Sequence, residues 1–97
     1  MKPENCRDMS DVGSEIDALD REIVRLLGKR AGYVRAAAKF KKDAASVRAE
    51  DRQRAMLAER ERWAEAEGLD PVFVKELYES IVSHFVKREM ESLEDRC

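Results

Sequence analysis

The apolar residues near the start of the chain recur at intervals of three and four, the spacing of one face of an α-helix. Because residues at this spacing lie on the same side of a helix, the pattern predicts a helix over about residues 11–42. Ser10 and Asp11 are both suited to cap its N-terminus, because their side-chain oxygens accept hydrogen bonds from free amides. The stripe consists of Val12, Ile16, Leu19, Ile23 and Leu27, and it continues through Arg30, Val34, Ala37 and Lys41.

Two further helices follow, and together they indicate an all-α fold with three helices per subunit. The second is expected over about 49–67 and the third over about 71–94. Asp70 is expected to cap the third helix, and Pro71 to be its first residue, because proline is favoured at that position. Residues 43–48 are predicted to form a loop between the first two helices. No segment alternates as a β-strand does.

Length and composition fit one domain and exclude several functions. The 97 residues, taken as a single domain over 1–97, contain 43% hydrophobic and 41% charged side chains, as is typical of helices with solvated faces. A net charge of −2 gives no basis for binding nucleic acid or an anionic membrane. No apolar run is long enough to span a membrane, and the first residues lack the core of a signal peptide. The cytoplasm is therefore the expected compartment.

The cysteines give no indication of a metal site. Cys6 and Cys97 lie near the two ends of the sequence and form no CxxC pair. The chain has one histidine, His84, and these three residues do not have the spacing of zinc ligands. We therefore expect two reduced thiols and no bound metal.

The first predicted helix is too long for a compact monomer. A helix of this length spans roughly 45 Å at about 1.5 Å per residue, whereas a compact chain of this size is only about 30 Å across. A helix that extends beyond its own domain must bury its apolar stripe against another chain. The sequence therefore predicts an intertwined homodimer in which this helix packs against its twofold-related copy.

Two cations interrupt the first apolar stripe. Ile16, Ile23, Arg30 and Ala37 are successive heptad positions, so Arg30 lies on the face of the isoleucines, and Lys41 continues the same stripe. An unpaired cation on an apolar face costs several kcal/mol, and an arginine cannot avoid this cost by losing its proton. We therefore expect an anionic group from the protein or from a ligand to meet these two side chains.

The other two predicted helices carry charges at comparable positions. Arg52 lies on the apolar side of the second helix, and Glu89 follows Val82 and Phe85 on one stripe of the third. Three cations and one carboxylate converging inside a bundle would form a pocket that binds and polarises a small polyanion. No serine or cysteine with a neighbouring base accompanies them. Val34 and Val82 lie on the same stripes and are expected to contact the ligand.

Each of these charges also has a structural explanation. Arg30 could pair with Glu89 as a buried structural ion pair. Lys41 lies near a helix end and could extend to water, and Arg52 lies in a first helical turn and could be solvated. The regular recurrence of the charges on apolar stripes favours the pocket.

Residues 16–41, IDALDREIVRLLGKRAGYVRAAAKFK, resemble the first helix of the all-helical (type II) chorismate mutase family. Residues 47–74, VRAEDRQRAMLAERERWAEAEGLDPVFV, are most similar to one branch of it, the isochorismate-pyruvate lyases of salicylate and siderophore biosynthesis. The resemblance covers about residues 5–93. The positions that carry the pattern of the first helix are Ile16-Asp17, Asp20, Ile23, Leu26-Leu27, Arg30, Val34 and Lys41.

The resemblance implies an entwined dimer with two active sites, no cofactor and no covalent intermediate. It implies that Arg30 binds a substrate carboxylate and that Lys41 contacts a carboxylate and the ether oxygen whose bond breaks. It further implies that Arg52 lines the pocket, that Glu89 lies over the ether oxygen, and that the loop at 43–48 closes over the ligand.

The sequence departs from the family pattern at two positions. The family usually has an arginine in the first turn of the first helix, which reaches into the partner's pocket, whereas this chain has Gly13. The lyase branch has glutamine where this chain has Glu89, and some mutases have glutamate. Ala49 and Gln53 replace acidic residues typical of mutases, which favours the lyase branch.

The resemblance predicts an isochorismate-pyruvate lyase that acts on a small dicarboxylate and has some chorismate mutase activity. A chorismate mutase that forms prephenate is the alternative. A third hypothesis, of another class, is a family member without activity that serves as a small-anion-binding or structural dimer, because Gly13 removes a carboxylate anchor.

Overall fold

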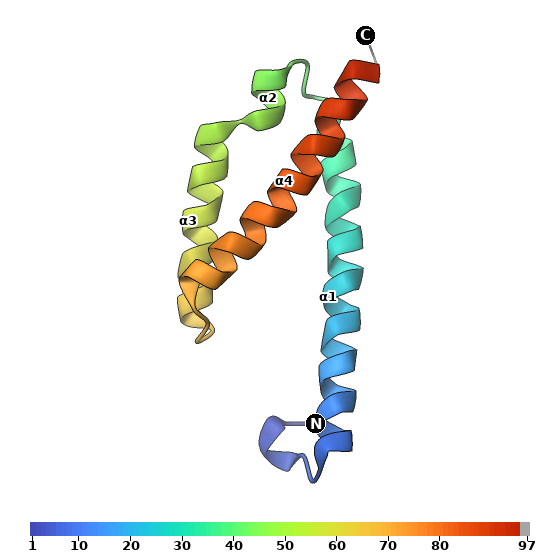
Figure 1. Ribbon diagram of the computed structural model, residues 1–97, viewed down its shortest axis with the longest axis vertical. Helices are drawn as coiled ribbons and strands as arrows, with labels where there is room; N and C mark the ends of the chain where they lie inside the picture. The colour runs from blue at the N-terminus through green and yellow to red at the C-terminus, as the bar shows by residue number, and fades with distance from the viewer. Residues whose placement is uncertain (96–97) are drawn as a thin grey trace. The chain divides into compact units, whose positions relative to one another are not determined.

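The computed structural model describes residues 1–95, and the regular elements in this range are helices (Figure 1). The all-α prediction is confirmed for the described part of the chain, and Cys97 lies outside it. The chain divides into two units, residues 1–33 and a second unit that begins at Val34, and each is described by itself. None of the helices described is both long enough and apolar enough to cross a membrane. The elements in chain order are the 3₁₀-helix η1 (Pro3–Asn5), α1 (Met9–Ala38), α2 (Ala44–Arg48), α3 (Glu50–Ala66) and α4 (Pro71–Asp95).

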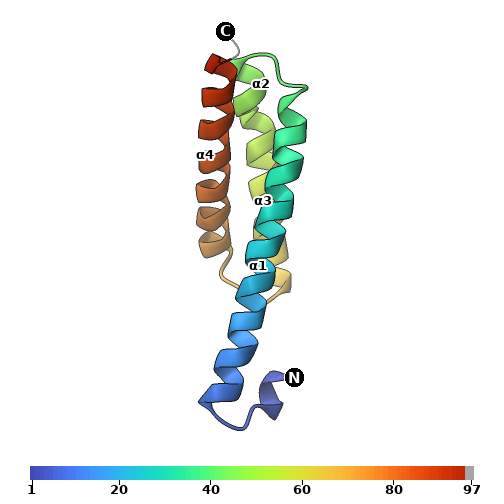
Figure 2. The ribbon, with the colours of Figure 1, turned by 90° about the vertical axis from the view of Figure 1, so that its right-hand side faces the viewer.

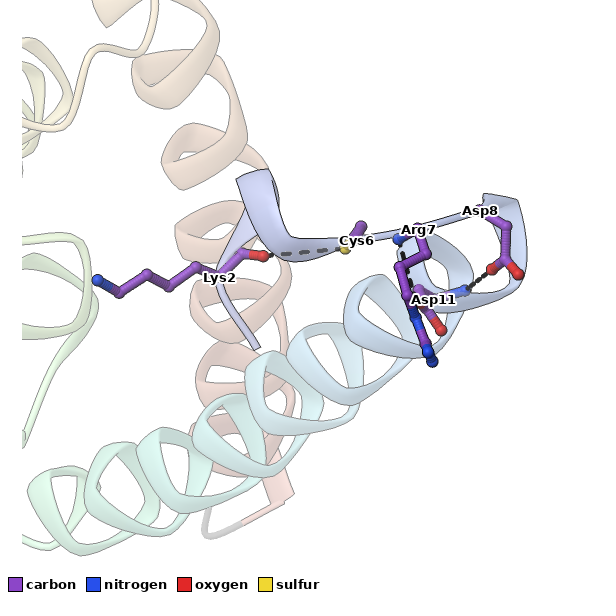
Figure 3. A network of polar contacts seen from close by, with 5 residues as sticks. All are labelled: Lys2, Cys6, Arg7, Asp8 and Asp11. Carbon is purple, nitrogen blue, oxygen red and sulfur yellow. Dashed lines mark hydrogen bonds and ion pairs between the residues drawn. The ribbon is translucent and has the colours of Figure 1, made fainter.

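Asp8 caps the N-terminus of α1 (Figure 3). Its Oδ1 atom accepts a hydrogen bond from the backbone N–H of Asp11 at 2.9 Å, and the Asp11 carboxylate accepts one from the backbone N–H of Arg7 at 3.0 Å. The first bond satisfies an amide that the first helical turn leaves without a partner, and the second ties the residue before the cap to that turn. The predicted cap at Ser10 or Asp11 is therefore wrong, because Met9 and the residues after it are already helical.

One face of α1 within the first unit is apolar and exposed in the single chain. Its residues are spaced three, four or seven apart, as are the core positions of a coiled coil, and no residue of α1 is buried. We call this set of residues the α1 seam. Its large side chains are between 48% and 79% exposed, and they are Met9, Ile16, Leu19, Ile23, Leu26 and Tyr33.

The second unit is built around α4. Helices α3 and α4 lie side by side near the turn that joins them, and α2 packs against α4 (Figure 1 and Figure 2). At the turn, Gly68 adopts a left-handed conformation with φ of 73°, and the N–H of Leu69 donates to the carbonyl of Ala64 at 2.8 Å. The apolar side chains buried in the described part of this unit are Val47 of α2, near the start of α3, and Ala64 of α3 and Val74 of α4, near the turn between those two helices.

Polar side chains fix the start of α4 and its packing on α3. The Asp70 carboxylate accepts a hydrogen bond from the N–H of Val72 at 2.9 Å, and Pro71 is the first helical residue. Both expectations for this helix start are therefore confirmed. The guanidinium of Arg60 on α3 lies 5.6 Å from the ring centroid of Tyr78 on α4, a cation–π contact that ties the two helices together.

The segment between α1 and α3 differs from the prediction. Helix α1 ends at Ala38 and not near residue 42, because the next three residues each donate a backbone hydrogen bond to the residue three positions earlier, at 3.0 to 3.3 Å. The predicted loop at 43–48 contains α2, with Asp43 as its N-cap. A helix of five residues spans little more than one turn, so no periodic pattern in the sequence reveals it.

Candidate active site

Lys41 and Glu89 meet in the second unit. The Nζ atom of Lys41 donates a hydrogen bond to Oε2 of Glu89 at 2.9 Å. The Lys41 side chain is 22% exposed and that of Glu89 is 9% exposed, so the pair is largely shielded from water. The two residues lie 48 positions apart in the sequence. The fold thus brings together two of the residues that the sequence singled out.

Helical register and a tight turn place this pair. Glu89 lies on the face of α4 that also carries Val82 and Phe85, both half-buried. Lys41 lies in the turn that follows α1, where its backbone N–H donates to the carbonyl of Ala38 at 3.2 Å. A buried carboxylate is costly unless a cation or hydrogen-bond donors meet it, and the Lys41 ammonium supplies both. The contact therefore joins the turn after α1 to α4 by a charge-assisted bond.

Arg30 and Val34 lie on α1 and are each half-buried. Arg30 belongs to the first unit, whereas Val34 opens the second. The Nη1 atom of Arg30 is inaccessible to solvent, so this guanidinium is partly shielded, as its place on the apolar stripe predicts. Roles for Arg30 and Val34 in ligand binding remain predictions.

The remaining predicted site residues are distributed over three helices. Arg52 lies in the first turn of α3 and is exposed, and Val82 is half-buried on α4. Gly13 is half-buried near the start of α1, and a Cβ atom added there would meet no neighbouring atom within 4 Å. A larger side chain can therefore be introduced at position 13 without a clash in the chain itself. The ligand-binding roles of these three residues remain predictions.

Asp43 is a residue that the sequence reasoning missed. Its Oδ1 atom accepts two hydrogen bonds from Ser46, one from the backbone N–H and one from the hydroxyl, both at 2.8 Å. The backbone bond first, and then the hydroxyl bond, hold the pKa of the Asp43 carboxyl below its usual range. The contribution of this cap to stability is therefore complete above the unfolded-state pKa and is lost as the pH falls through the lower folded-state pKa. The signal in the sequence is the spacing of an aspartate three residues before a serine, which is typical of a capped turn.

Comparison with known proteins agrees with the resemblance seen in the sequence. Residues 12–90 match the protein family described as chorismate mutase type II. The chain is also 42% identical over 88 residues to a protein of Pseudomonas aeruginosa named isochorismate pyruvate lyase, an alignment that covers 91% of this chain and 87% of that relative. On these grounds, the chain belongs to the type II chorismate mutase family.

Proposed function

We propose that this protein is an isochorismate-pyruvate lyase, which converts isochorismate to salicylate and pyruvate. The observation that carries the proposal is the shielded contact between Lys41 and Glu89, in a chain that is 42% identical to a protein named for this activity. A second activity, the rearrangement of chorismate to prephenate, is supported by the family match. Glu89 also favours it, because some mutases that the sequence resembles carry glutamate there.

The proposed chemistry needs polarisation of one oxygen and no nucleophile. The ether C–O bond of isochorismate breaks, its electrons pass to the oxygen that becomes the pyruvate carbonyl group, and a ring hydrogen moves to the enolpyruvyl methylene, which becomes the methyl group of pyruvate. An ether oxygen that enters between Lys41 and Glu89 meets an ammonium group on one side and a carboxyl group on the other. The ammonium stabilises negative charge as it develops on that oxygen, and Arg30 and Arg52 are proposed to hold the substrate carboxylates.

We further propose that the protein acts as a homodimer with shared active sites. The α1 seam is exposed in the single chain although its side chains are large and apolar, and exposed apolar stripes of this kind mark protein interfaces. Its spacing fits packing against a second copy of the same helix. In such a dimer, the start of α1, which carries Gly13, is proposed to reach the partner's site.

Separate assays with isochorismate and chorismate test the proposed function. With isochorismate we expect salicylate and pyruvate in equal amounts, and with chorismate a slower formation of prephenate. A protein that forms prephenate faster than salicylate would be a mutase. A folded dimer that transforms neither substrate would instead support the binding or structural role.

Glu89→Gln tests whether Glu89 donates a hydrogen bond to the ether oxygen. A glutamate side chain donates only when it is protonated, whereas a glutamine amide donates at every pH. Glu89→Gln is therefore expected to have a kcat/KM at least equal to the parent's, because the amide supplies the donor permanently. Glu91→Gln, at an exposed position of the same helix, is the matched control and should keep the parent's kcat/KM. A kcat/KM that falls in Glu89→Gln but not in Glu91→Gln would leave Glu89 only the role of pairing with Lys41.

Gly13→Arg is expected to lower KM by about tenfold to a hundredfold, the value of one charge-assisted hydrogen bond of about 1.5–3 kcal/mol. The new cation would reach the partner's pocket and bind a substrate carboxylate. Gly13→Ala is the matched control, since it raises helix propensity by about 1 kcal/mol without adding charge. Steady-state kinetics and thermal unfolding of both variants separate binding from stability. An unchanged KM in Gly13→Arg would show that the pocket binds its ligand without an anchor at this position.

A further inference from the structure

We propose that Asp43 is a positioning residue for Lys41. Its carboxylate holds α2 and the turn before it in the conformation that brings the Lys41 ammonium to Glu89. This inference rests on the proposed function, in which Lys41 acts on the substrate.

The hydrogen bonds of Asp43 stabilise a helix that is too short to form alone. Helix α2 has five residues, and an isolated helix of this length is unstable in water because nucleation is costly. Asp43 has an extended backbone, with φ of −146° and ψ of 173°, and accepts both bonds from Ser46. A side chain in this position satisfies amides that the first turn leaves free. The cap therefore fixes the start of α2 and the direction of the chain that enters it.

The far end of α2 is fixed by packing and by a constrained backbone. Val47 is 1% exposed, and α2 packs against α4, the helix that carries Glu89. Ala49, which follows α2, has φ of 38°, a left-handed conformation that a residue with a side chain adopts only when its surroundings hold it there. The segment is therefore held at both ends, by the Asp43 cap and by the Val47 contact.

Lys41 depends on this arrangement because a single residue, Lys42, separates it from Asp43. A lysine side chain is flexible and keeps its geometry only when its backbone is fixed. If the cap is lost, the turn samples other conformations, and the contact of Lys41 with Glu89 at 2.9 Å is populated for a smaller fraction of the time. The expected consequence is a lower kcat in a protein that remains folded, because the buried side chains Ala64 and Val74 are untouched.

Three variants of Asp43 and its partner test the inference kinetically. Asp43→Ala should lower kcat by about fivefold to tenfold, in proportion to the loss of a typical N-cap. Asp43→Asn should remain within about twofold of the parent, because asparagine caps helices as well as aspartate does. Ser46→Ala should show a small loss, since the backbone N–H of residue 46 still donates. A merely structural role for Asp43 predicts a lower Tm in Asp43→Ala and an unchanged kcat.

A double-mutant cycle tests whether Asp43 acts through Lys41. In a Lys41→Ala background, Asp43→Ala should cause no further loss of kcat, because the residue that it positions is already gone. A full additional loss in that background would overturn the inference.

A spectroscopic readout separates this inference from the proposed function. The ¹³C resonance of the Glu89 side-chain carboxyl, measured without substrate, should shift in Lys41→Ala. In Asp43→Ala it should shift part of the way in the same direction, and Asp43→Asn should restore it. If the parent transforms neither isochorismate nor chorismate, the proposed function fails, but a shift in Asp43→Ala would still support the positioning of Lys41. An unmoved Glu89 resonance in Asp43→Ala would refute the positioning role whatever the activity.

Discussion

Lys41→Ala is expected to lower kcat by about a hundredfold to a thousandfold while the fold is retained. The Lys41 ammonium is mostly shielded from water, with its side chain 22% exposed, and lies 2.9 Å from Glu89. In such a site, one donor aimed at an oxygen that gains charge in the transition state contributes about 3–4 kcal/mol. The measurement is kcat with isochorismate at saturating concentration, together with helicity by circular dichroism.

Lys42→Ala is the matched control for this prediction. Lys42 is adjacent to Lys41 and has the same side chain, but it is exposed, so its loss should change kcat by less than about twofold. If Lys41→Ala and Lys42→Ala show the same kcat, the charge at position 41 does not act on the substrate, and the candidate active site is misplaced.

Ile23→Glu is expected to convert the proposed dimer to monomers at micromolar concentration. Ile23 lies in the middle of the α1 seam and is 54% exposed in the single chain. In a twofold interface the change would bury two unpaired carboxylates, each at a cost of about 2 kcal/mol or more, which weakens association by about a thousandfold. Light scattering gives the mass, and thermal unfolding at several protein concentrations shows whether Tm still rises with concentration.

Arg21→Glu introduces the same side chain on another face of α1 and is the matched control. Arg21 is exposed and lies outside the seam, so the variant should remain a dimer with the parent's activity. Ile23→Glu should lose activity in parallel with the dimer, because each site is proposed to need both subunits. A monomeric parent, or a monomeric Ile23→Glu that keeps its activity, would refute the shared site, and a dimeric Ile23→Glu would refute the α1 seam as the interface.

The long helices of this fold could be predicted from the sequence, whereas the short helix α2 could not. Long helices such as α1 and α4 repeat an apolar face over many turns, and Asp70 and Pro71 mark a helix start by their own chemistry. By contrast, α2 is shorter than the window that reveals a period, and its existence depends on the burial of Val47 against α4 and on the Asp43 cap. These are tertiary and side-chain effects that hydrophobic spacing does not encode.

Some features of the candidate site could likewise be predicted from the sequence, and others could not. The presence of Lys41 and Glu89 on apolar stripes made them candidates, because a charge on such a stripe needs a partner. That these two residues contact each other depends on a turn whose backbone bonds end α1 at Ala38, which the sequence pattern extended to residue 42. Asp43 was missed because it does not lie on an apolar stripe. Its proposed role is indirect, since it fixes the backbone beside Lys41.

In the proposed site, the contact between Lys41 and Glu89 would also select among anions. Because Glu89 already neutralises Lys41, an inorganic ion such as phosphate gains little by approaching this lysine, since it must compete with a carboxylate that is held in place. A dicarboxylate that reaches further cations with its other end can offset the cost of displacing Glu89. The Glu89 carboxylate would thus act as an internal competitor that weak and abundant anions fail to displace, and selectivity would arise from repulsion as well as from attraction.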